Sequence, residues 1–383
     1  MDIEKLINNQ TINAEPTFSA FLHSRAGAAG LAASGTFELT SRCNFNCKMC
    51  YVHNQDNALC RATEKSAEWW IELGKKAAEN GTIFLLLTGG EPLLREDFEE
   101  IYTALAKMGF LISINTNGYL LNEKTFNLFK KYPPSRVNVS LYGATEETYE
   151  ALTGVRGFER VLSNLKALRE MGIDVRINGS FTKYNYKEIK QIYDITRELG
   201  FHVKGTPYMF PPVLIGGEAG HNSGRLSAEE AAANRVDWLK LLYSPQEFCK
   251  RIGATLNGID AFELSRDEEC AEGKIKCRAG KSSYWVNSKG EMCFCGVAGK
   301  GYSIDELGFT GAWERVKEFS ASVRTPAKCE SCKYKHLCSV CAAACYTETG
   351  SFTEVPEYVC RFTEETARLM KIESERLEKE NGN

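Results

Sequence analysis

The chain has 383 residues, 43% of them hydrophobic, and a net charge of −3, with Lys and Arg scattered among Asp and Glu. This length predicts two domains, or one large barrel with an appendage, and the absence of a basic stripe argues against a nucleic-acid partner. No apolar run approaches the roughly 20 residues that span a bilayer, and the first ten residues lack a secretory signal core, so we expect a cytoplasmic protein with no membrane partner.

Residues 35–208 predict a parallel α/β domain, because short β-type runs alternate there with helical patterns. Six strands are expected, at residues 35–40, 82–87, 111–115, 136–141, 174–180 and 201–207. Amphipathic helices are expected between them, at residues 66–79, 96–107, 123–131, 158–170 and 186–199. Six such units are too few for a closed eight-stranded barrel.

Residues 215–224 are rich in glycine and predict a linker that leaves this domain. Within it, His221 is interpreted as a solvated loop histidine. Residues 226–251 predict a helix with Ser227 as its N-cap. The expected domains are an N-terminal segment (1–34), the barrel (35–214), a linker with a bridging helix (215–265), a cysteine-rich domain (266–362) and a C-terminal helix (363–383).

Three cysteines follow the first expected strand at C-x3-C-x2-C spacing: Cys43, Cys47 and Cys50. Structural zinc sites and ordinary 4Fe-4S clusters take four protein ligands. Three close thiols therefore suggest a cubane with one iron left open for a small molecule. Taken alone, the triplet also fits part of a zinc site.

The run TGGEP follows the second expected strand, at residues 88–92. Together with the cysteine triplet it resembles the radical S-adenosylmethionine (AdoMet) superfamily. The resemblance implies a partial (β/α)6 TIM barrel, a 4Fe-4S cluster on the triplet, and AdoMet bound to the open iron and cleaved to a 5'-deoxyadenosyl radical. It also implies that Gly89, Gly90 and Glu91 receive the AdoMet ammonium group.

Further AdoMet contacts are implied by the same resemblance. Asn117 and Ser140, at the ends of the third and fourth strands, look like the residues that hold the ribose and the carboxylate. Arg176 is expected to pair with that carboxylate through two parallel hydrogen bonds, or else to form a surface ion pair. Met49 stands where the family usually has an aromatic residue against the adenine, and a thioether can pack on a purine edge.

Ten further cysteines begin at Cys270, and their spacing resembles the SPASM domain, which usually carries two auxiliary 4Fe-4S clusters. After Cys338 the family pattern has three residues before the next cysteine, whereas this chain has two. Cys341 and Cys345 are therefore both candidates for that cluster ligand. A pair of zinc knuckles is the alternative, since both metals take thiolates. The resemblance implies one cluster on Cys270, Cys277, Cys295 and Cys341 and a second on Cys329, Cys332, Cys338 and Cys360.

Four cysteines are left unassigned: Cys60, Cys249, Cys293 and whichever of Cys341 and Cys345 is not a ligand. Cys60 follows the triplet and Cys293 is close to an expected cluster ligand, so both are candidates for donating a hydrogen atom or assisting substrate binding. Cys249 is interpreted as a small buried hydrophobe on its helix.

The enzymes that this chain resembles mostly modify peptides or proteins. We therefore predict an oxidoreductase that acts as a maturase of a ribosomally made and modified peptide (RiPP) and forms a thioether or carbon-carbon crosslink. Its expected partners are the peptide or protein substrate and a reductant such as flavodoxin or ferredoxin. Because only 34 residues precede Gly35, any peptide leader is expected to be bound by the core protein, by a separate leader-binding protein, or not at all.

Three other functions stay open. A formylglycine-forming sulfatase maturase has the same architecture, but that group places a catalytic Asp directly after the cysteine aligned with Cys295, where this chain has Gly296. Radical dehydrogenation of a small alcohol is the second, and a non-catalytic iron-sulfur or zinc scaffold is the third.

Overall fold

The computed structural model describes residues 17–50, 58–211, 224–256, 275, 277–338 and 340–381. The interpretation of His221, the ligand prediction for Cys270 and nearly all of the predicted linker lie outside the described residues. None of the described helices is both long and apolar enough to cross a lipid bilayer.

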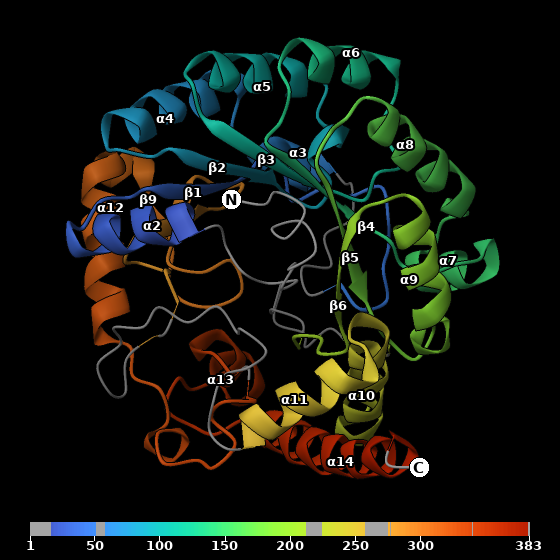
Figure 1. Cartoon of the computed structure of the whole chain (residues 1–383). Helices are drawn as coiled ribbons and strands as arrows, with labels where there is room; N and C mark the ends of the chain where they lie inside the picture. The colour runs from blue at the N-terminus through green and yellow to red at the C-terminus, as the bar shows by residue number, and fades with distance from the viewer. Residues whose placement is uncertain are drawn as a thin grey trace.

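Six parallel strands form the predicted partial barrel, and their observed ends lie within two residues of the predicted ones (Figure 1). The strand order β6-β5-β4-β3-β2-β1 follows the chain, as expected for successive βα units. The strands are β1 (Ser34–Glu38), β2 (Phe84–Thr88), β3 (Leu111–Thr116), β4 (Arg136–Ser140), β5 (Val175–Ser180) and β6 (His202–Thr206).

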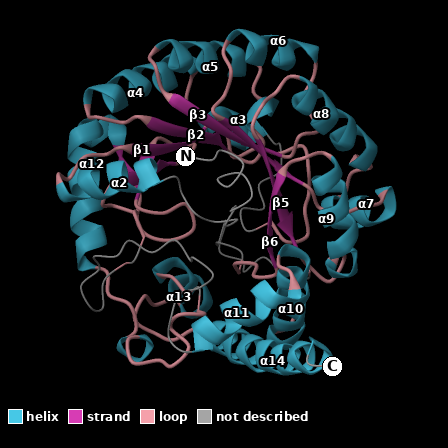
Figure 2. Cartoon of the chain, in the orientation of Figure 1, coloured by secondary structure: helices cyan, strands magenta, loops and turns pink. Residues whose placement is uncertain are grey.

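Helices cover the convex side of this sheet (Figure 2). The five predicted helices are present, the last one beginning with a short 3-10 turn, η2 (Tyr186–Glu188). The sequence analysis missed α7, an eight-residue helix that Thr145 caps at its N-terminus. The helices of this half are α2 (Thr17–Ala28), α3 (Ala58–Thr63), α4 (Ala67–Glu79), α5 (Phe98–Lys107), α6 (Glu123–Lys131), α7 (Glu146–Thr153), α8 (Phe158–Glu170) and α9 (Ile189–Glu198), with η1 (Pro92–Leu94) after β2.

The strands alternate between a buried apolar face and a polar face. Successive side chains point to opposite sides of a sheet, so Phe37, Leu85 and Val139 are buried under the helices. The intervening residues, such as Asn138 and Asn178, are only partly buried and line the concave side. The concave side of the barrel is therefore polar along β3 to β6.

The cysteine-rich region extends the same sheet. Strand β7 (Ser283–Val286) pairs in parallel with β1, and β8 (Glu291–Cys293) and β9 (Tyr302–Ser303) follow in antiparallel order. Thus β1 lies between β2 and β7 in a nine-stranded sheet. The other elements of this region are α12 (Ile304–Ser322), η3 (Ala327–Cys329), α13 (Ala342–Thr349) and α14 (Glu357–Asn381).

The single helix predicted for residues 226–251 is two helices, α10 (Ala228–Leu242) and α11 (Pro245–Leu256). Pro245 lacks a backbone N–H, so it fits the first turn of a new helix better than the interior of a long one. The predicted N-cap is confirmed, because Ser227 and Glu230 form a reciprocal capping box. Helix α14 packs along both helices and begins at Glu357, within the domain predicted for 266–362.

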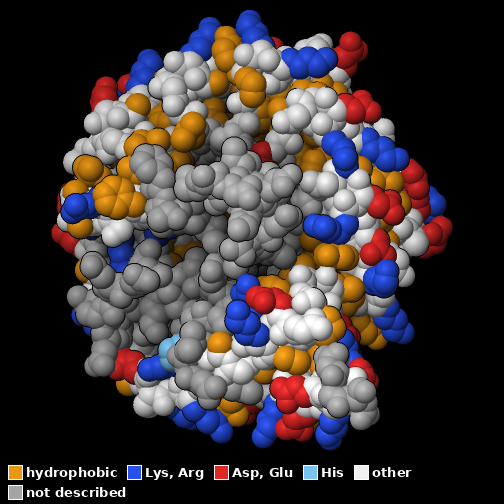
Figure 3. Space-filling view, viewed as in Figure 1, with side chains coloured by type: hydrophobic (Ala, Val, Ile, Leu, Met, Phe, Trp, Pro, Cys, Tyr) orange, Lys and Arg blue, Asp and Glu red, His pale blue; other side chains and the backbone are white. Residues whose placement is uncertain are grey.

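On the face shown in Figure 3, Lys and Arg are interspersed with Asp and Glu around the outer helices. This distribution agrees with the mixed charge pattern of the sequence.

Candidate functional site

The TGGEP run fixes the start of the cysteine loop. Backbone pairing between β1 and β2 continues past the strand ends: the Gly90 N–H donates to the Thr40 carbonyl at 2.9 Å, and the Glu91 N–H donates to the Arg42 carbonyl at 2.8 Å. These bonds end one residue before Cys43. The motif therefore determines where the first thiol lies.

Both glycines of the motif are required by this close approach. A Cβ atom at Gly89 would lie 2.4 Å from the Thr40 carbonyl oxygen, and one at Gly90 would lie 2.2 Å from that of Arg42. Gly89 also has a φ of 157°, which side chains with a Cβ rarely adopt.

An ion-pair network lies behind the loop. The Arg42 guanidinium donates to the Glu64 carboxylate at 2.7 Å and 3.1 Å, and Arg95 pairs with Glu64 at 3.8 Å and with Asp97 at 2.7 Å. Arg95 also donates to the Leu39 carbonyl at 2.8 Å. Arg42 and Arg95 are less than 10% exposed, so these charges are held in one geometry against the loop.

The other side of the loop is held by α7. The Asn46 N–H donates to the Thr153 carbonyl and the Lys48 N–H to the Leu152 carbonyl, both at 2.9 Å. Met49, predicted to contact adenine, is buried in a small cluster with Leu152 and Met209. Much of its side chain therefore already packs against protein.

Without a metal ion, burial favours the protonated form of two thiols of the triplet, Cys43 and Cys47. Burial raises the pKa of Cys43 to about 11, and burial with the neighbouring thiols raises that of Cys47 well above its usual range. A buried thiol is deprotonated when a metal ion replaces its proton. The Cys43 sulfur already accepts from the Phe45 N–H at 3.4 Å and the Asn117 amide at 3.9 Å, as sulfur ligands of clusters do.

No three His, Cys, Asp or Glu side chains within the described ranges are placed to hold one metal ion. Zinc-sulfur bonds of about 2.3 Å would bring thiolate ligands within about 4 Å of one another. A cubane instead distributes its thiolates over separate irons.

Glu91 joins the ends of β2 and β3. Its side chain is fully buried and accepts from the Thr116 hydroxyl at 2.9 Å, the Asn117 N–H at 2.7 Å and the Leu93 N–H at 3.1 Å. Burial outweighs these bonds and raises the pKa of the carboxyl to about 7. A cation beside it would favour the charged form.

The other predicted AdoMet residues occupy two levels of the concave face. The Asn117 side chain donates to Asn44 at 2.8 Å, which connects the end of β3 to the cysteine loop. In the β4-β5 register Ser140 is opposite Asn178, whereas Arg176 is opposite Asn138, two residues deeper. Asn178, which the sequence analysis did not select, is therefore the β5 residue level with Ser140.

The auxiliary cysteines of the described region gather in two groups. Burial raises the pKa of the Cys277 thiol to about 11, and the nearby Cys295 and Cys341 add to this rise. Burial likewise raises the pKa of Cys360, with contributions from Cys338, Cys329 and Cys332. The groups are thus Cys277, Cys295 and Cys341, and Cys329, Cys332, Cys338 and Cys360.

Cys341 and Cys345 differ in position. Cys341 caps α13, its sulfur accepting from the Ala344 N–H at 3.4 Å. Cys345 lies inside α13, is 1% exposed, and has Cys329, Cys341 and Cys338 as electrostatic neighbours. It therefore lies between the two groups.

The two cysteines that are candidates for donating a hydrogen atom lie on different secondary-structure elements. Cys60 is on α3, and Cys293 is on β8. Burial raises the pKa of Cys293 to about 12, with contributions from the neighbouring Glu291 and Glu38. Cys249 is partly buried on α11 and packs beside a small apolar cluster, as its interpretation requires.

The sequence analysis also missed Glu38. This residue ends β1 on the concave face and accepts a hydrogen bond from the Trp285 indole at 3.1 Å. Burial raises the pKa of its carboxyl to about 7. Its alternation with the buried Phe37 at the end of β1 was the only mark of it in the sequence.

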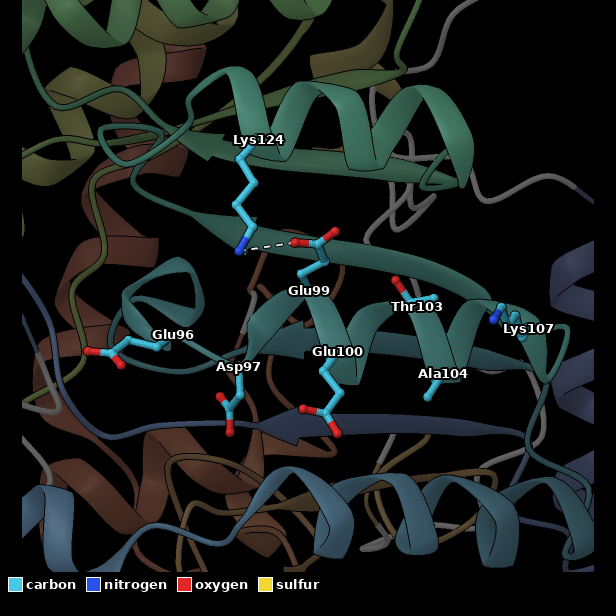
Figure 4. A pocket seen from close by; sticks show the side chains of 8 residues that line it. All are labelled: Glu96, Asp97, Glu99, Glu100, Thr103, Ala104, Lys107 and Lys124. Carbon is cyan, nitrogen blue, oxygen red and sulfur yellow. Dashed lines mark ion pairs between the residues drawn. The ribbon is translucent and has the colours of Figure 1, made fainter.

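A surface pocket lies away from this site, on the outer side of α5 (Figure 4). Lys124 reaches Glu99 at 3.0 Å there, and the remaining acidic lining residues surround the start of the helix. Its place on the convex side separates it from the cysteine loop.

Comparisons with known proteins agree with this arrangement. Residues 37–195 match the model of the radical SAM superfamily. An AdoMet-dependent heme synthase from Methanosarcina barkeri is 28% identical, over 84% of this chain and 94% of that protein. A probable GTP 3',8-cyclase from Saccharolobus islandicus is 34% identical, but the match spans 42% of this chain and about half of that protein, 52%.

Two solved structures share the fold over most of the chain. Streptococcus suis SuiB bound to its precursor peptide SuiA has a TM-score of 0.64 at 19% identity, covering 91% of this chain and 82% of SuiB. The structure of anSMEcpe with AdoMet and the Kp18Cys peptide has a TM-score of 0.64 at 18% identity, covering 90% of this chain and 99% of anSMEcpe.

Proposed function

We propose, from the premise that residues 37–195 form a radical SAM domain, that this protein is a peptide maturase. It abstracts a hydrogen atom from a ribosomally made peptide and forms a thioether or carbon-carbon crosslink. The observation that carries the proposal is the fold likeness to peptide-bound SuiB over 91% of the chain, which extends beyond the radical SAM domain.

Cys43, Cys47 and Cys50 are proposed to hold the 4Fe-4S cluster that binds AdoMet. When bound, cluster and AdoMet supply a 5'-deoxyadenosyl radical that can abstract hydrogen from an unactivated C–H bond. The chain fixes the thiols from both sides, through the TGGEP backbone and through α7. Its N–H groups at Phe45 and Asn117 donate to the Cys43 sulfur.

AdoMet itself is proposed to lie between the ends of β1 to β5. Gly89, Gly90 and Glu91 are proposed to receive its ammonium. This is supported by Glu91, a buried carboxyl that a neighbouring cation would hold in the charged form. Asn117 and Ser140 would bind the ribose and the carboxylate. To these we add Asn178, because it is level with Ser140 in the sheet.

The two groups of auxiliary cysteines are proposed to hold 4Fe-4S clusters, with Cys270 completing the first. The grouping of the described thiols supports this division. The domain division predicted from the sequence is kept as a proposal, with the C-terminal helix starting at Glu357.

A second candidate is radical modification of a tetrapyrrole. It is favoured by the sequence similarity to the heme synthase, which extends over 84% of this chain and nearly the whole of that protein. The similarity to the GTP cyclase covers only 42% of the chain and gives no comparable support.

Anaerobic reconstitution followed by dithionite and AdoMet tests the enzyme class. Formation of 5'-deoxyadenosine and methionine is expected, and a protein that forms neither is a scaffold rather than an enzyme. Co-expression with short open reading frames beside the gene then tests the substrate. A peptide that loses two mass units supports crosslinking, whereas a changed Soret absorbance of an added porphyrin, with no peptide change, supports the second candidate.

A further inference from the structure

Three cations lie near one another at β5, β6 and α10. Arg176 is opposite His202 in the register, and Lys204 is opposite Asn178, so Arg176 and Lys204 are diagonal neighbours on one face. Arg235 comes from α10, whose Trp238 packs on the buried face of β6, where a Cβ at Gly205 would lie 2.6 Å from its ring, and Arg235 is an electrostatic neighbour of Lys204. Two strands and a helix thus bring these residues together.

Within the described part of the chain, the side chains of Arg176, Lys204 and Arg235 form no hydrogen bond or ion pair. Their neighbour Arg136 is different, because it pairs with Asp174 at 2.7 Å. The ion pair between Arg136 and Asp174 therefore does not neutralise the positive charge of Arg176, Lys204 and Arg235.

The two arginines act on Lys204. Enclosure by the protein lowers the pKa of Lys204, and the nearby Arg176 and Arg235 lower it further. Burial also lowers the pKa of Arg235. Like charges held together, with Lys204 exposed and Arg176 and Arg235 partly buried, are unfavourable until an anion joins them.

We propose that Arg176, Lys204 and Arg235 form a binding site for a carboxylate of the substrate. The inference rests on the proposed function, since it assumes that the substrate enters the concave side of the barrel. Arg176 lies two residues below the level of Ser140, about 7 Å deeper in the barrel. One AdoMet carboxylate does not match three cations on two levels, so the substrate supplies the remaining negative charge.

The chemistry of the cations fits this ligand. A guanidinium binds a carboxylate through two parallel hydrogen bonds, and a lysine adds a point charge. Both candidate substrate classes carry carboxylates, on acidic residues or the C-terminus of a peptide and on the side chains of a tetrapyrrole. The part of the substrate that reaches β6 therefore carries a carboxylate.

Binding is tested with two carboxylate probes and their neutral analogues on the reconstituted full-length protein. The probes are a dansyl-labelled tetraglutamate peptide against the tetraglutamine peptide, and mesoporphyrin IX against its dimethyl ester. At least one carboxylate probe is expected to bind more tightly than its analogue. Lys204→Gln and Arg235→Gln should each weaken that binding about 10-fold, the scale for losing one charged hydrogen bond.

Lys190→Gln is the matched control, because it removes the same charge from the outer surface of α9, where Lys190 pairs with Asp194. It should bind both probes as the parent protein does. If Arg235→Gln fails to fold by circular dichroism, Arg235→Lys and Lys204→Gln carry the test. Preference for the peptide or the porphyrin identifies the source of the carboxylate.

Two results would overturn the inference. One is equal binding of the carboxylate probes by the parent protein and both variants. The other is a raised KM for AdoMet in the variants with unchanged probe binding, which would assign the cluster to AdoMet. Failure of the parent protein to cleave AdoMet would instead remove the proposed function, and it is measured separately from probe binding.

Discussion

The indole ring of Trp285 lies directly over Gly296: a Cβ atom at position 296 would be 2.8 Å from two atoms of the ring. The ring is also fixed by its indole N–H, which donates to Glu38 at 3.1 Å. This packing leaves no room for the aspartate that sulfatase maturases are expected to place after the cysteine aligned with Cys295. It is a structural reason to prefer the other proposed functions.

Replacing Gly296 with Asp should therefore destabilise the protein without creating formylglycine activity. Displacing a packed ring costs about 1–3 kcal/mol, measured as the free energy of unfolding in urea. Gly253→Ala is the control, because a Cβ at that helical position meets nothing within 4 Å. A fully stable Gly296→Asp protein that oxidises a sulfatase peptide would reverse this conclusion.

Substituting Cys43, Cys47 and Cys50 together by Ala should abolish AdoMet cleavage. Iron should fall from about twelve to about eight atoms per chain, because two auxiliary cubanes remain. Iron and sulfide analysis of the anaerobic protein measures this, with Cys249→Ala as the control. Loss of all iron would contradict the division into three separate sites.

Cys341→Ala and Cys345→Ala should differ in iron content. Cys341 is an electrostatic neighbour of Cys277 and Cys295, so its loss should remove about four irons. Cys345→Ala should keep the iron of the parent protein. The reverse result would make Cys345 the ligand and leave Cys341 as a helix cap.

Glu64→Gln should loosen the cysteine loop. Removing this carboxylate leaves Arg42 with a weaker partner, and breaking a buried pair costs about 3 kcal/mol. Thermal unfolding should show the loss, and the iron of the first cluster should become easier to chelate. Glu72→Gln, on the exposed side of α4, should change the free energy of unfolding by less than about 0.5 kcal/mol.

Glu38→Gln should change how stability depends on pH. The folded carboxyl has a pKa of about 7 instead of 4.5, because burial disfavours its charge. Between these values the folded chain keeps a proton that the unfolded chain releases, so the free energy of unfolding falls as the pH rises.

The glutamine variant should therefore match the parent protein near pH 4.5 and exceed it above pH 7. The gain is bounded by the pKa shift and reaches about 3 kcal/mol at most. Urea unfolding at pH 5 and pH 8 measures it, with the exposed Glu147→Gln as the control. An equal effect at both pH values would show that the buried charge is not the cause.

The barrel could be predicted because its signals are local. Alternating strands and amphipathic helices determine β1 to β6 within two residues, and Ser227 with Glu230 marks the start of α10. The break at Pro245 was missed because helical periodicity continues across it. Strand β7 was missed because only its pairing with β1, far away in the chain, makes residues 283–286 a strand.

The site could be predicted in part. The spacing of Cys43, Cys47 and Cys50 carries its own chemistry, whereas Lys204 and Arg235 are ordinary charged residues in the sequence. Their proximity depends on strand register and on how α10 packs against β6. One sequence contains no local signal for either.

The pairing of β1 with both β2 and β7 has a consequence for synthesis of the chain. Strand β7 begins about 245 residues after β1 ends, so a ribosome adding 5–20 residues per second needs about 10–50 s to supply it. Until then one edge of β1 lacks its backbone partner, and an unpaired edge invites pairing with another chain. The nascent protein thus depends on protection of this edge before its last cysteines emerge.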